Sequence, residues 1–270
     1  TNGDISVDAG GNITVVAVDD TAGANLVTLD SGGTIDDGAA GAGVVTAQDL
    51  ELIAVNGITD FNTNVNNIAL SVTTGGATVI DDNGLAIADL TVVGGATDGA
   101  TTVGALSVTA AGASSLAVNR PVASNGGAVT LTADADVTFA AAGDVASGGG
   151  LVTITADADG AAGGAVTMAN GAVVDAGTAA ITVDADGDIT LGSLATTGIV
   201  AVALTSTSGG IVDGGDADVD VAAPGATLQI VSDTGVGAGD AIETNIAVLN
   251  VANAVSGNVQ VTELAGAGDD

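Results

Sequence analysis

Apolar and polar residues alternate with a period of two in many short segments of this chain. The clearest segment is ITVDADGDIT, which starts at Ile181, and variants of it start at Ile5, Leu131 and Ile154. A period of two is that of a strand with one buried face. Leu131, Ile154 and Ile181 follow one another at steps of 23 and 27 in the numbering, and we expect them to occupy one position of successive repeats. A short strand that returns at such intervals predicts the coils of a β-solenoid.

The predicted fold is all-β, a single right-handed parallel β-helix that continues over residues 1–270. Glycine pairs such as Gly126-Gly127 separate the predicted strands, and no Pro/Ser linker or change of composition divides the chain. At roughly 22 to 28 residues per coil the chain gives about ten to twelve coils, and at about 4.8 Å per coil the rod is about 50 to 55 Å long. The crossovers between its parallel strands are expected to be right-handed.

A longer repeat is superimposed on the coils. GTIDDG at Gly33 matches GGIVDG at Gly209 with an offset of 176 in the numbering, and TNVNNIAL at Thr63 matches TNIAVLNV at Thr244 with an offset of 181. The matches stay in order while the offset grows slowly, which is the pattern of a duplicated block with small loop insertions. The predicted copies are residues 3–87 and 179–266, and residues 88–178 form a middle repeat segment.

The composition narrows the class of protein and its partners. The 270 residues are 47% hydrophobic but only 1% aromatic, and the net charge is −32 with Arg120 as the single basic residue. Disordered chains lack so many apolar residues, and phosphate binding needs clustered Lys and Arg. These features exclude nucleic acid and anionic membrane surfaces, and they leave cations, basic proteins, neutral glycans and other copies of the chain. The acidity also fits adaptation to salty water, where salt screens the self-repulsion.

The residue types that are missing argue against an enzyme. The chain has no His and no Cys, which removes Ser–His–Asp and Cys–His catalysis, disulfides and the usual zinc sites. Arg120 is the one side chain that could act in a polysaccharide lyase, and we expect it to cover the irregular corner at Pro121 or to pair with an Asp. Two Asp-[Ser/Thr]-Gly triplets, at Asp30 and Asp233, lie at non-equivalent places of the two copies, unlike those of an aspartic protease. No apolar run is long enough for a membrane-spanning helix.

Aspartates that recur in the repeat form the candidate metal site. If the coils stack directly, like charges lie about 5 Å apart, and each contact costs about 0.8 kcal/mol in bulk water. Calcium, with its oxygen ligands, would reverse that cost; the alternative is that solvated carboxylates keep the rod soluble. The string at Asp184 resembles the start of a calcium loop, but Ile189 and Ala195 stand where an EF-hand has Gly and an acidic residue. The candidate Ca²⁺ ligands are Asp134, Asp157 and Asp184 at one repeat position, Asp136, Asp159 and Asp186 at another, and Asp188.

Threonines form a second outward row. Thr132, Thr155 and Thr182 are predicted to stack, and a flat, regular Thr array on a solenoid can order water as an ice-binding surface does. The row is short and the coils differ in length, which argues against that function.

Two segments of the second copy carry a resemblance to a known family. The strings GDITLGSLATTGIVAVALTSTSGGIVDGG and LQIVSDTGVGAGDAIETNIAVLNVANAVSGNVQVTE resemble the repeats of large bacterial surface proteins of the filamentous-haemagglutinin-like adhesin type. The resemblance implies a right-handed parallel β-helix that is secreted to the cell surface. Because Thr1 is not a natural start, we also expect a processed product or a piece of a longer protein.

We therefore expect an extracellular structural protein at the bacterial cell surface. Its rod would form or contribute to a filament, sheath or layer by end-to-end or lateral self-association. The alternative is the shaft or binding segment of a secreted adhesin that contacts glycans, partner cells or other surface proteins. Glycan sites usually stack sugars on aromatic rings, and Phe61 and Phe139 are the only aromatic residues, which favours the structural role.

Overall fold

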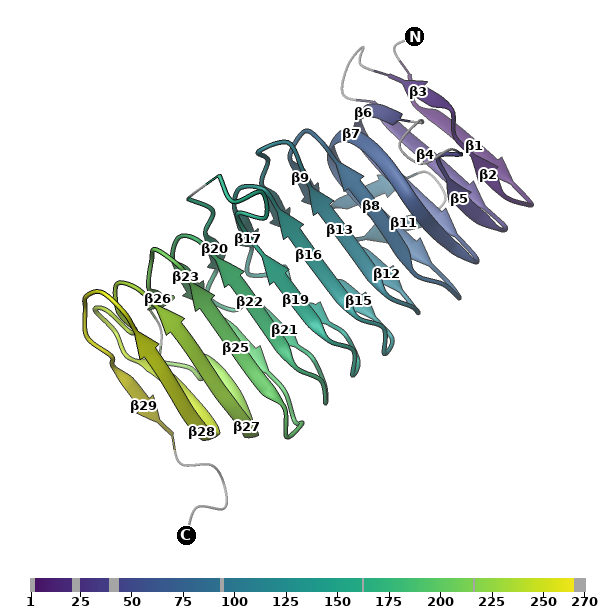
Figure 1. The fold of residues 1–270 in the computed structure, drawn as a ribbon. Coiled ribbons are helices and arrows are strands. Elements are labelled where there is room, and N and C mark those ends of the chain that lie inside the picture. The colour runs from purple at the N-terminus through teal and green to yellow at the C-terminus, as the bar shows by residue number, and fades with distance from the viewer. Residues whose placement is uncertain are drawn as a thin grey trace.

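The computed structural model describes residues 3–20, 25–38, 44–92, 95–161, 163–215 and 217–264. Thr1 and the last two residues of the predicted second copy, 265 and 266, lie outside these ranges. The described residues contain no helix. Nearly all strands belong to one 27-stranded, mostly parallel sheet, and two more form a small antiparallel sheet. The chain winds into a rod whose first and last described residues lie at opposite ends (Figure 1), so the prediction of a β-solenoid is confirmed.

Three parallel ladders follow the rod through its middle and C-terminal coils. They are named A, B and C in the order in which the chain passes through them. Ladder A contains β8 (Ala77–Asp81), β13 (Leu106–Ala110), β16 (Val129–Ala133), β19 (Val152–Thr155), β22 (Ile181–Ala185), β25 (Ala201–Ser206) and the second halves of β27 (Val221–Ser232) and β28 (Ile242–Asn253). Ladder B contains β9 (Leu85–Ile87), β14 (Leu116–Val118), β17 (Val137–Phe139), β20 (Val166–Met168), β23 (Ile189–Leu191) and β26 (Ile211–Asp213). Ladder C contains β12 (Ala100–Thr102), β15 (Val122–Ser124), β18 (Val145–Ala146), β21 (Val173–Asp175), β24 (Ser193–Ala195), the first halves of β27 and β28, and β29 (Val261–Glu263).

The N-terminal coils continue these ladders, and they contain two unusually long strands. Two of the strands, β6 and β7, run through a corner of the coil, so each of them pairs with more than one neighbour. These coils contain β1 (Ile5–Ala9), β2 (Ile13–Thr14), β3 (Ala17–Asp19), β4 (Leu26–Ser31), β5 (Thr34–Asp36), β6 (Val44–Ala54) and β7 (Gly57–Val72).

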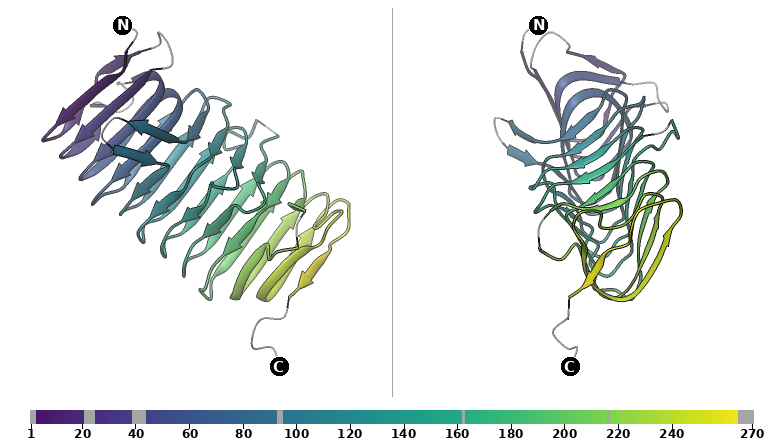
Figure 2. Two further views of the ribbon diagram at one scale, coloured as in Figure 1. Left: turned by 180° about the vertical axis from the view of Figure 1, so that it is seen from behind. Right: turned by 90° about the vertical axis from the view of Figure 1, so that its left-hand side faces the viewer.

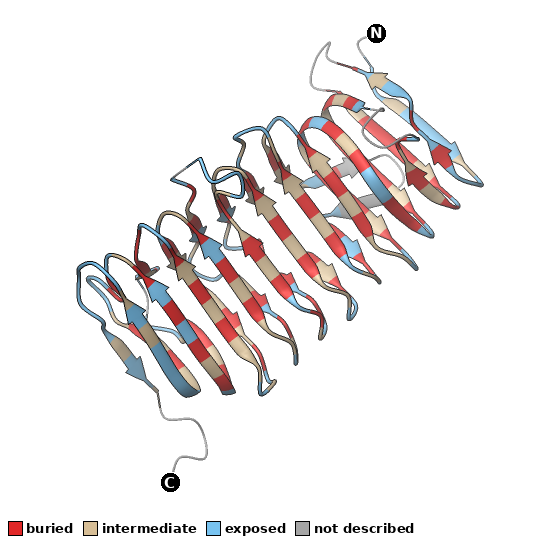
Figure 3. Cartoon of the chain, in the orientation of Figure 1, coloured by how far each residue is buried: buried red, intermediate tan, exposed pale blue. Residues whose placement is uncertain are grey.

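The interior consists of columns of mostly aliphatic side chains. In ladder A, Leu106 pairs with Val129, Val129 with Val152, and Val152 with Ile181, and all four are at most 1% exposed. Within each of these strands, every second residue belongs to such a column and the residues that alternate with it point outward. This produces the alternating burial along the strands in Figure 3. Each coil alone has one apolar face to cover, and the stacking of neighbours covers it. The period-two pattern of the sequence therefore becomes a continuous core.

Glycines allow the coils to approach at the corner that precedes ladder A. A Cβ atom on Gly127 would clash with the backbone of Gly104, and one on Gly150 would clash with the backbone of Gly127. Hydroxyls close the same corner, since the Oγ of Ser124 donates to the Gly127 carbonyl at 2.6 Å and the Oγ1 of Thr102 donates to the Gly104 carbonyl at 2.8 Å. The corner is thus set by residues without bulk and by short polar side chains.

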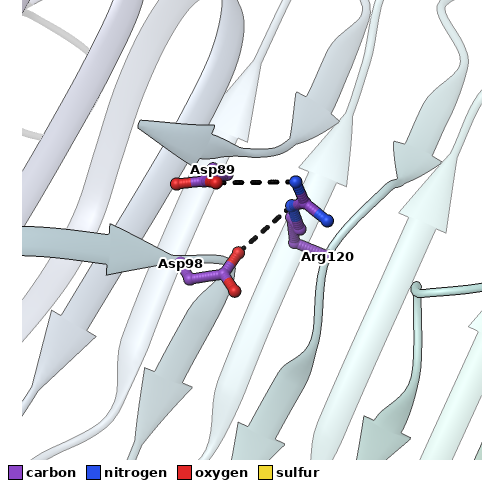
Figure 4. A network of polar contacts seen from close by, with 3 residues as sticks. All are labelled: Asp89, Asp98 and Arg120. Carbon is purple, nitrogen blue, oxygen red and sulfur yellow. Dashed lines mark hydrogen bonds and ion pairs between the residues drawn. The ribbon is translucent and has the colours of Figure 1, made fainter. Parts of the chain in front are cut away.

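A hairpin stands out from the side of the rod between ladders B and C (Figure 2). Its strands β10 (Asp89–Val92) and β11 (Gly95–Asp98) are antiparallel, and Asp89 lies opposite Asp98 at its base. Arg120 on the next coil contacts both carboxylates, with Nη2 at 3.5 Å from Asp89 Oδ2 and Nε at 3.3 Å from Asp98 Oδ1 (Figure 4). The expectation that Arg120 pairs with an Asp is confirmed. These ion pairs are solvent-exposed, so each is worth about 1 kcal/mol or less.

The coil lengths and one register differ from the sequence-based expectation. Leu50 pairs with Ile68, a step of 18, and Ala77 pairs with Leu106, a step of 29, so the spread is wider than the expected range. Ile154 pairs with Val183 rather than with Ile181. The alignment of the third repeat was therefore wrong by two positions, because the turn after Ile154 is longer than the turn after Leu131.

Candidate metal centre

The structure moves Asp184 out of the column in which the sequence placed it. Thr155 pairs with Asp184, so Asp184 is not stacked on Asp157. Most of the seven candidate ligands accept hydrogen bonds from backbone amides of turns, as Asp commonly does. The contacts are Asp134 Oδ2 with Ala113 N at 3.4 Å, Asp136 Oδ1 with Ala165 N at 2.9 Å, Asp159 Oδ1 with Ala161 N at 3.0 Å, Asp186 Oδ2 with Gly163 N at 2.9 Å and Asp188 Oδ1 with Gly210 N at 2.7 Å. The calcium prediction for these residues stays a prediction.

Part of this set does line a surface hollow. Asp157, Asp184 and Asp186 surround a hollow of about 280 Å³ together with Thr155 and Thr207. The hydroxyls of Thr207 and Ser208 and the amide of Gly163 donate to Asp186 and hold the pKa of its carboxyl below the usual value. The carboxylate form is thus favoured there.

The predicted threonine row is also rearranged. Thr132 pairs with Thr155 as expected, but Asp184 follows in that column, and Thr182 stacks on Thr153 in the neighbouring column. The Thr153 column includes Thr130 and ends at Ala203. The array is therefore two columns wide and is interrupted by a charge and a methyl group.

Three other carboxylates come together at one corner of the C-terminal coils. One oxygen from each of Asp213, Asp220 and Glu243 lies within 4.8 Å of the others, and no other such group of three occurs among the described residues. Asp213 ends β26 in ladder B, Asp220 precedes the first half of β27 in ladder C, and Glu243 lies in β28 on the next coil. We call these three residues the acidic corner.

Backbone contacts fix the geometry of the acidic corner. Asp220 N donates to the Glu243 carbonyl at 3.0 Å, and Glu243 N donates to Asp220 Oδ2 at 2.8 Å. Asp213 Oδ1 accepts from Gly215 N at 2.9 Å. Asp213 is 7% exposed, and its Oδ2 is buried without a hydrogen-bond partner in the described part of the chain. A buried carboxylate oxygen without a partner is costly, so Asp213 Oδ2 is the feature of this corner that requires an explanation.

The protein supplies no positive charge to the acidic corner. Arg120 is the only basic side chain, and it pairs with Asp89 and Asp98 at the hairpin. Two like charges about 4 Å apart repel by about 1 kcal/mol in water and by about 4 kcal/mol at the effective dielectric constant of a protein surface. A bound cation would relieve this repulsion.

The predicted first copy shows what the chain does at the equivalent corner. The offset of 176 places Asp37 at the position of Asp213, and the offset of 181 places Asn62 at the position of Glu243. Asn62 Nδ2 donates a hydrogen bond to Asp37 Oδ2. In the first copy, Asp37 therefore accepts a hydrogen bond from a side-chain amide, whereas Oδ2 of the equivalent Asp213 has no such partner.

Neighbouring contacts support this equivalence. In the first copy Asp81 accepts from the Thr63 hydroxyl at 2.8 Å and from Val65 N at 2.9 Å. In the second copy Glu263 accepts from the Thr244 hydroxyl at 2.7 Å and from Ile246 N at 3.0 Å. The same arrangement of hydroxyl, amide and carboxylate occurs beside both corners, so the comparison of Asn62 with Glu243 is a comparison of like positions.

The acidic corner was not found from the sequence. Its residues are far apart in the numbering and match no metal-binding motif, and only the register of the coils brings them together. A signal was nevertheless present, because the two repeat offsets align Asp37 with Asp213 and Asn62 with Glu243. A change from amide to carboxylate between repeat copies marks a place where the local chemistry differs.

The fold and the acidic corner define a β-solenoid rod with a cluster of two buried carboxylates and one half-buried carboxylate. Comparisons with models of protein families, with curated proteins and with solved structures found no match. The resemblance to filamentous-haemagglutinin-like adhesins stays a prediction. No helix long and apolar enough to cross a membrane occurs among the described residues.

Proposed function

We propose that the chain is a structural rod that forms or contributes to an extracellular filament, sheath or surface layer. The observation that carries the proposal is the continuous parallel ladder from β1 to β29 over one largely aliphatic core. Such a rod gains length and one more stabilising interface from every added coil, because each coil contacts its neighbours. An interior filled in this way offers length and rigidity rather than a substrate cavity.

The edges of the rod support self-association. The second half of β28 pairs with β27 on one side, and no described strand pairs with residues 248–253 on the other side. Val248 and Leu249 on this edge are 53% and 42% exposed. Unpaired edges accept a further strand, either from more coils of the same protein or from another copy, and the apolar side chains favour that addition.

The alternative is the shaft of a secreted adhesin. Phe61 and Phe139 are 0% and 3% exposed, so neither ring is available to stack on a sugar. A glycan would have to be held by the outward Thr, Ser and Asp side chains alone. The buried aromatic residues therefore favour the structural role.

Negative-stain electron microscopy of the purified chain in millimolar calcium tests the proposal. We expect filaments or sheets whose axial repeat is close to the length of one rod. Val248→Lys/Leu249→Lys, which places charges on the exposed edge, should shorten or abolish them. Thr138→Lys/Thr167→Lys, which places the same charges on exposed positions of β17 and β20 in the middle of the rod, should leave end-to-end filaments unchanged. Isolated rods at every protein concentration would contradict self-association and favour the adhesin shaft.

A further inference from the structure

The acidic corner has the chemistry of a cation site. Its three groups are all carboxylates, and hard cations with oxygen ligands are the ions that carboxylates hold best. Asp213 Oδ2 is buried and accepts no hydrogen bond in the described part of the chain, and one carboxylate oxygen of Asp213 lies within 4.8 Å of an oxygen of each of the other two residues. This oxygen is free to bind an ion without breaking an existing contact.

We propose that Asp213, Asp220 and Glu243 bind one calcium ion, which joins two consecutive coils. Ca²⁺–oxygen distances are about 2.3 to 2.6 Å, so two oxygens on opposite sides of the ion are about 4.6 to 5.2 Å apart. The limit of 4.8 Å within the acidic corner is compatible with that span. Mg²⁺ usually takes one or two carboxylates and keeps several waters, which makes a site with three carboxylates better suited to calcium.

The position of the corner determines what the ion would do. Asp213 and Asp220 lie at the two ends of one turn, and Glu243 lies on the following coil. An ion bound to all three would close the turn and also link the coils, next to the mutual hydrogen bonds of Asp220 and Glu243. Calcium therefore acts as a structural clamp near the C-terminal end of the described rod, independently of whether the rod forms filaments.

The first copy suggests the substitution that tests the site. Because Asn62 donates to Asp37 at the equivalent corner, Glu243→Asn should place an amide where it can donate to Asp213 Oδ2. The variant is expected to lose the ion, to melt at a higher temperature than the ion-free wild type, and to become insensitive to calcium. A purely structural role for Glu243, without an ion, would instead make the variant no more stable in chelator than the wild type.

The experiment is calcium binding by isothermal titration calorimetry and thermal unfolding by circular dichroism, in about 150 mM NaCl to suppress diffuse binding. The wild type should show one saturable site that Glu243→Asn lacks. Calcium at about 100-fold above its Kd should raise the melting temperature of the wild type by roughly 5 to 10 °C. Mg²⁺ at the same concentration should produce a much smaller shift.

Controls separate this site from the general acidity of the chain. Asp8→Asn removes one exposed charge elsewhere and should keep both the saturable site and the calcium-dependent shift. Asp213→Asn is a second variant that should lose the site if Glu243→Asn folds poorly. The proposal is overturned if the wild type has no saturable site, if both variants retain it, or if acidification stabilises the wild type in chelator while calcium has no effect.

Discussion

Buried carboxylates are the individual residues that determine how this protein responds to its solution conditions. Asp81 is fully buried and accepts hydrogen bonds from Val65 N, Asn83 N and the Thr63 hydroxyl. Burial raises the pKa of its carboxyl above the usual value, although the three hydrogen bonds oppose the shift. Its burial therefore makes the ionised form less favoured than it is in a solvent-exposed Asp.

The raised pKa of Asp81 predicts the sign of a pH effect. A group whose pKa is higher in the folded than in the unfolded state contributes stability below the unfolded value, near 3.8, and that contribution is lost as the pH rises through the folded value. The free energy of unfolding of the wild type minus that of Asp81→Asn should therefore increase as the pH is lowered from 7 towards 4. Urea unfolding followed by circular dichroism at each pH measures it, and a difference that falls would contradict the assignment.

Among individual residues, the sequence identifies the acidic side chains but does not tell which of them come together in one site. The aspartates of the repeat were visible because they stand beside alternating apolar residues, yet most of them accept turn amides. Asp213, Asp220 and Glu243 were not distinguishable from other acidic residues until the corner brought them within 4.8 Å. Proximity across coils is a property of register, and register is weakly encoded in any one strand.

Elements were the most predictable part of the molecule. Strands with clear alternation, such as β16 and β22, lie where the period of two indicated. The register error at the third repeat has a simple cause: a slip by two positions keeps every side chain on its own face, so Ile181 and Val183 satisfy the apolar pattern equally. The length of the preceding turn determines which of the two residues pairs with Ile154. The number of residues in a glycine-rich turn could not be predicted from the sequence pattern.

The glycine corner gives a prediction about elements. Gly127→Ala should destabilise the protein by about 1 to 3 kcal/mol, because the new methyl group would overlap the backbone of Gly104 and force the two coils apart. Gly11→Ala is the matched control, since a Cβ atom there meets nothing within 4 Å, and it should change stability by about 0.5 kcal/mol or less. Equal effects of the two substitutions on chemical denaturation would show that the close approach of coils is not what requires glycine.

The outward threonine columns of ladder A also lead to a prediction. They are interrupted by Asp184 and Ala203, and a charge orders water differently from a row of hydroxyl and methyl groups. We expect no thermal hysteresis beyond that of the buffer in nanolitre osmometry. A measurable hysteresis that Thr153→Lys abolishes would instead assign this face an ice-binding function.

The whole molecule combines a largely aliphatic core with a net charge of −32. The apolar content and the charge could be read from the composition, and the solenoid could be predicted from the repeated strands. The proposed role in a filament or layer rests on the form of the rod. A single sign of charge spread over a long rod repels itself, and added salt screens the repulsion.

The charge leads to a prediction for the whole rod. In the presence of a chelator, the melting temperature should rise as NaCl is increased from about 10 mM to about 500 mM, because screening relieves repulsion in the folded rod more than in the expanded chain. Differential scanning calorimetry measures the change, and Asp8→Asn should start slightly higher and follow the same trend. A melting temperature that is independent of salt would show that the surface charge carries little energetic cost.

The hydrogen bonds of the ladders run along the rod axis, and this direction has a mechanical consequence. A pull on the two ends of the rod would load the coils one after another, so they would unwind singly instead of resisting together. Each released coil, which spans a step of 18 to 31 in the numbering, would lengthen the chain by about 60 to 110 Å. Stretched between two anchors, the protein would extend in many small steps at low force and would behave as an extensible tether, even though it resists bending.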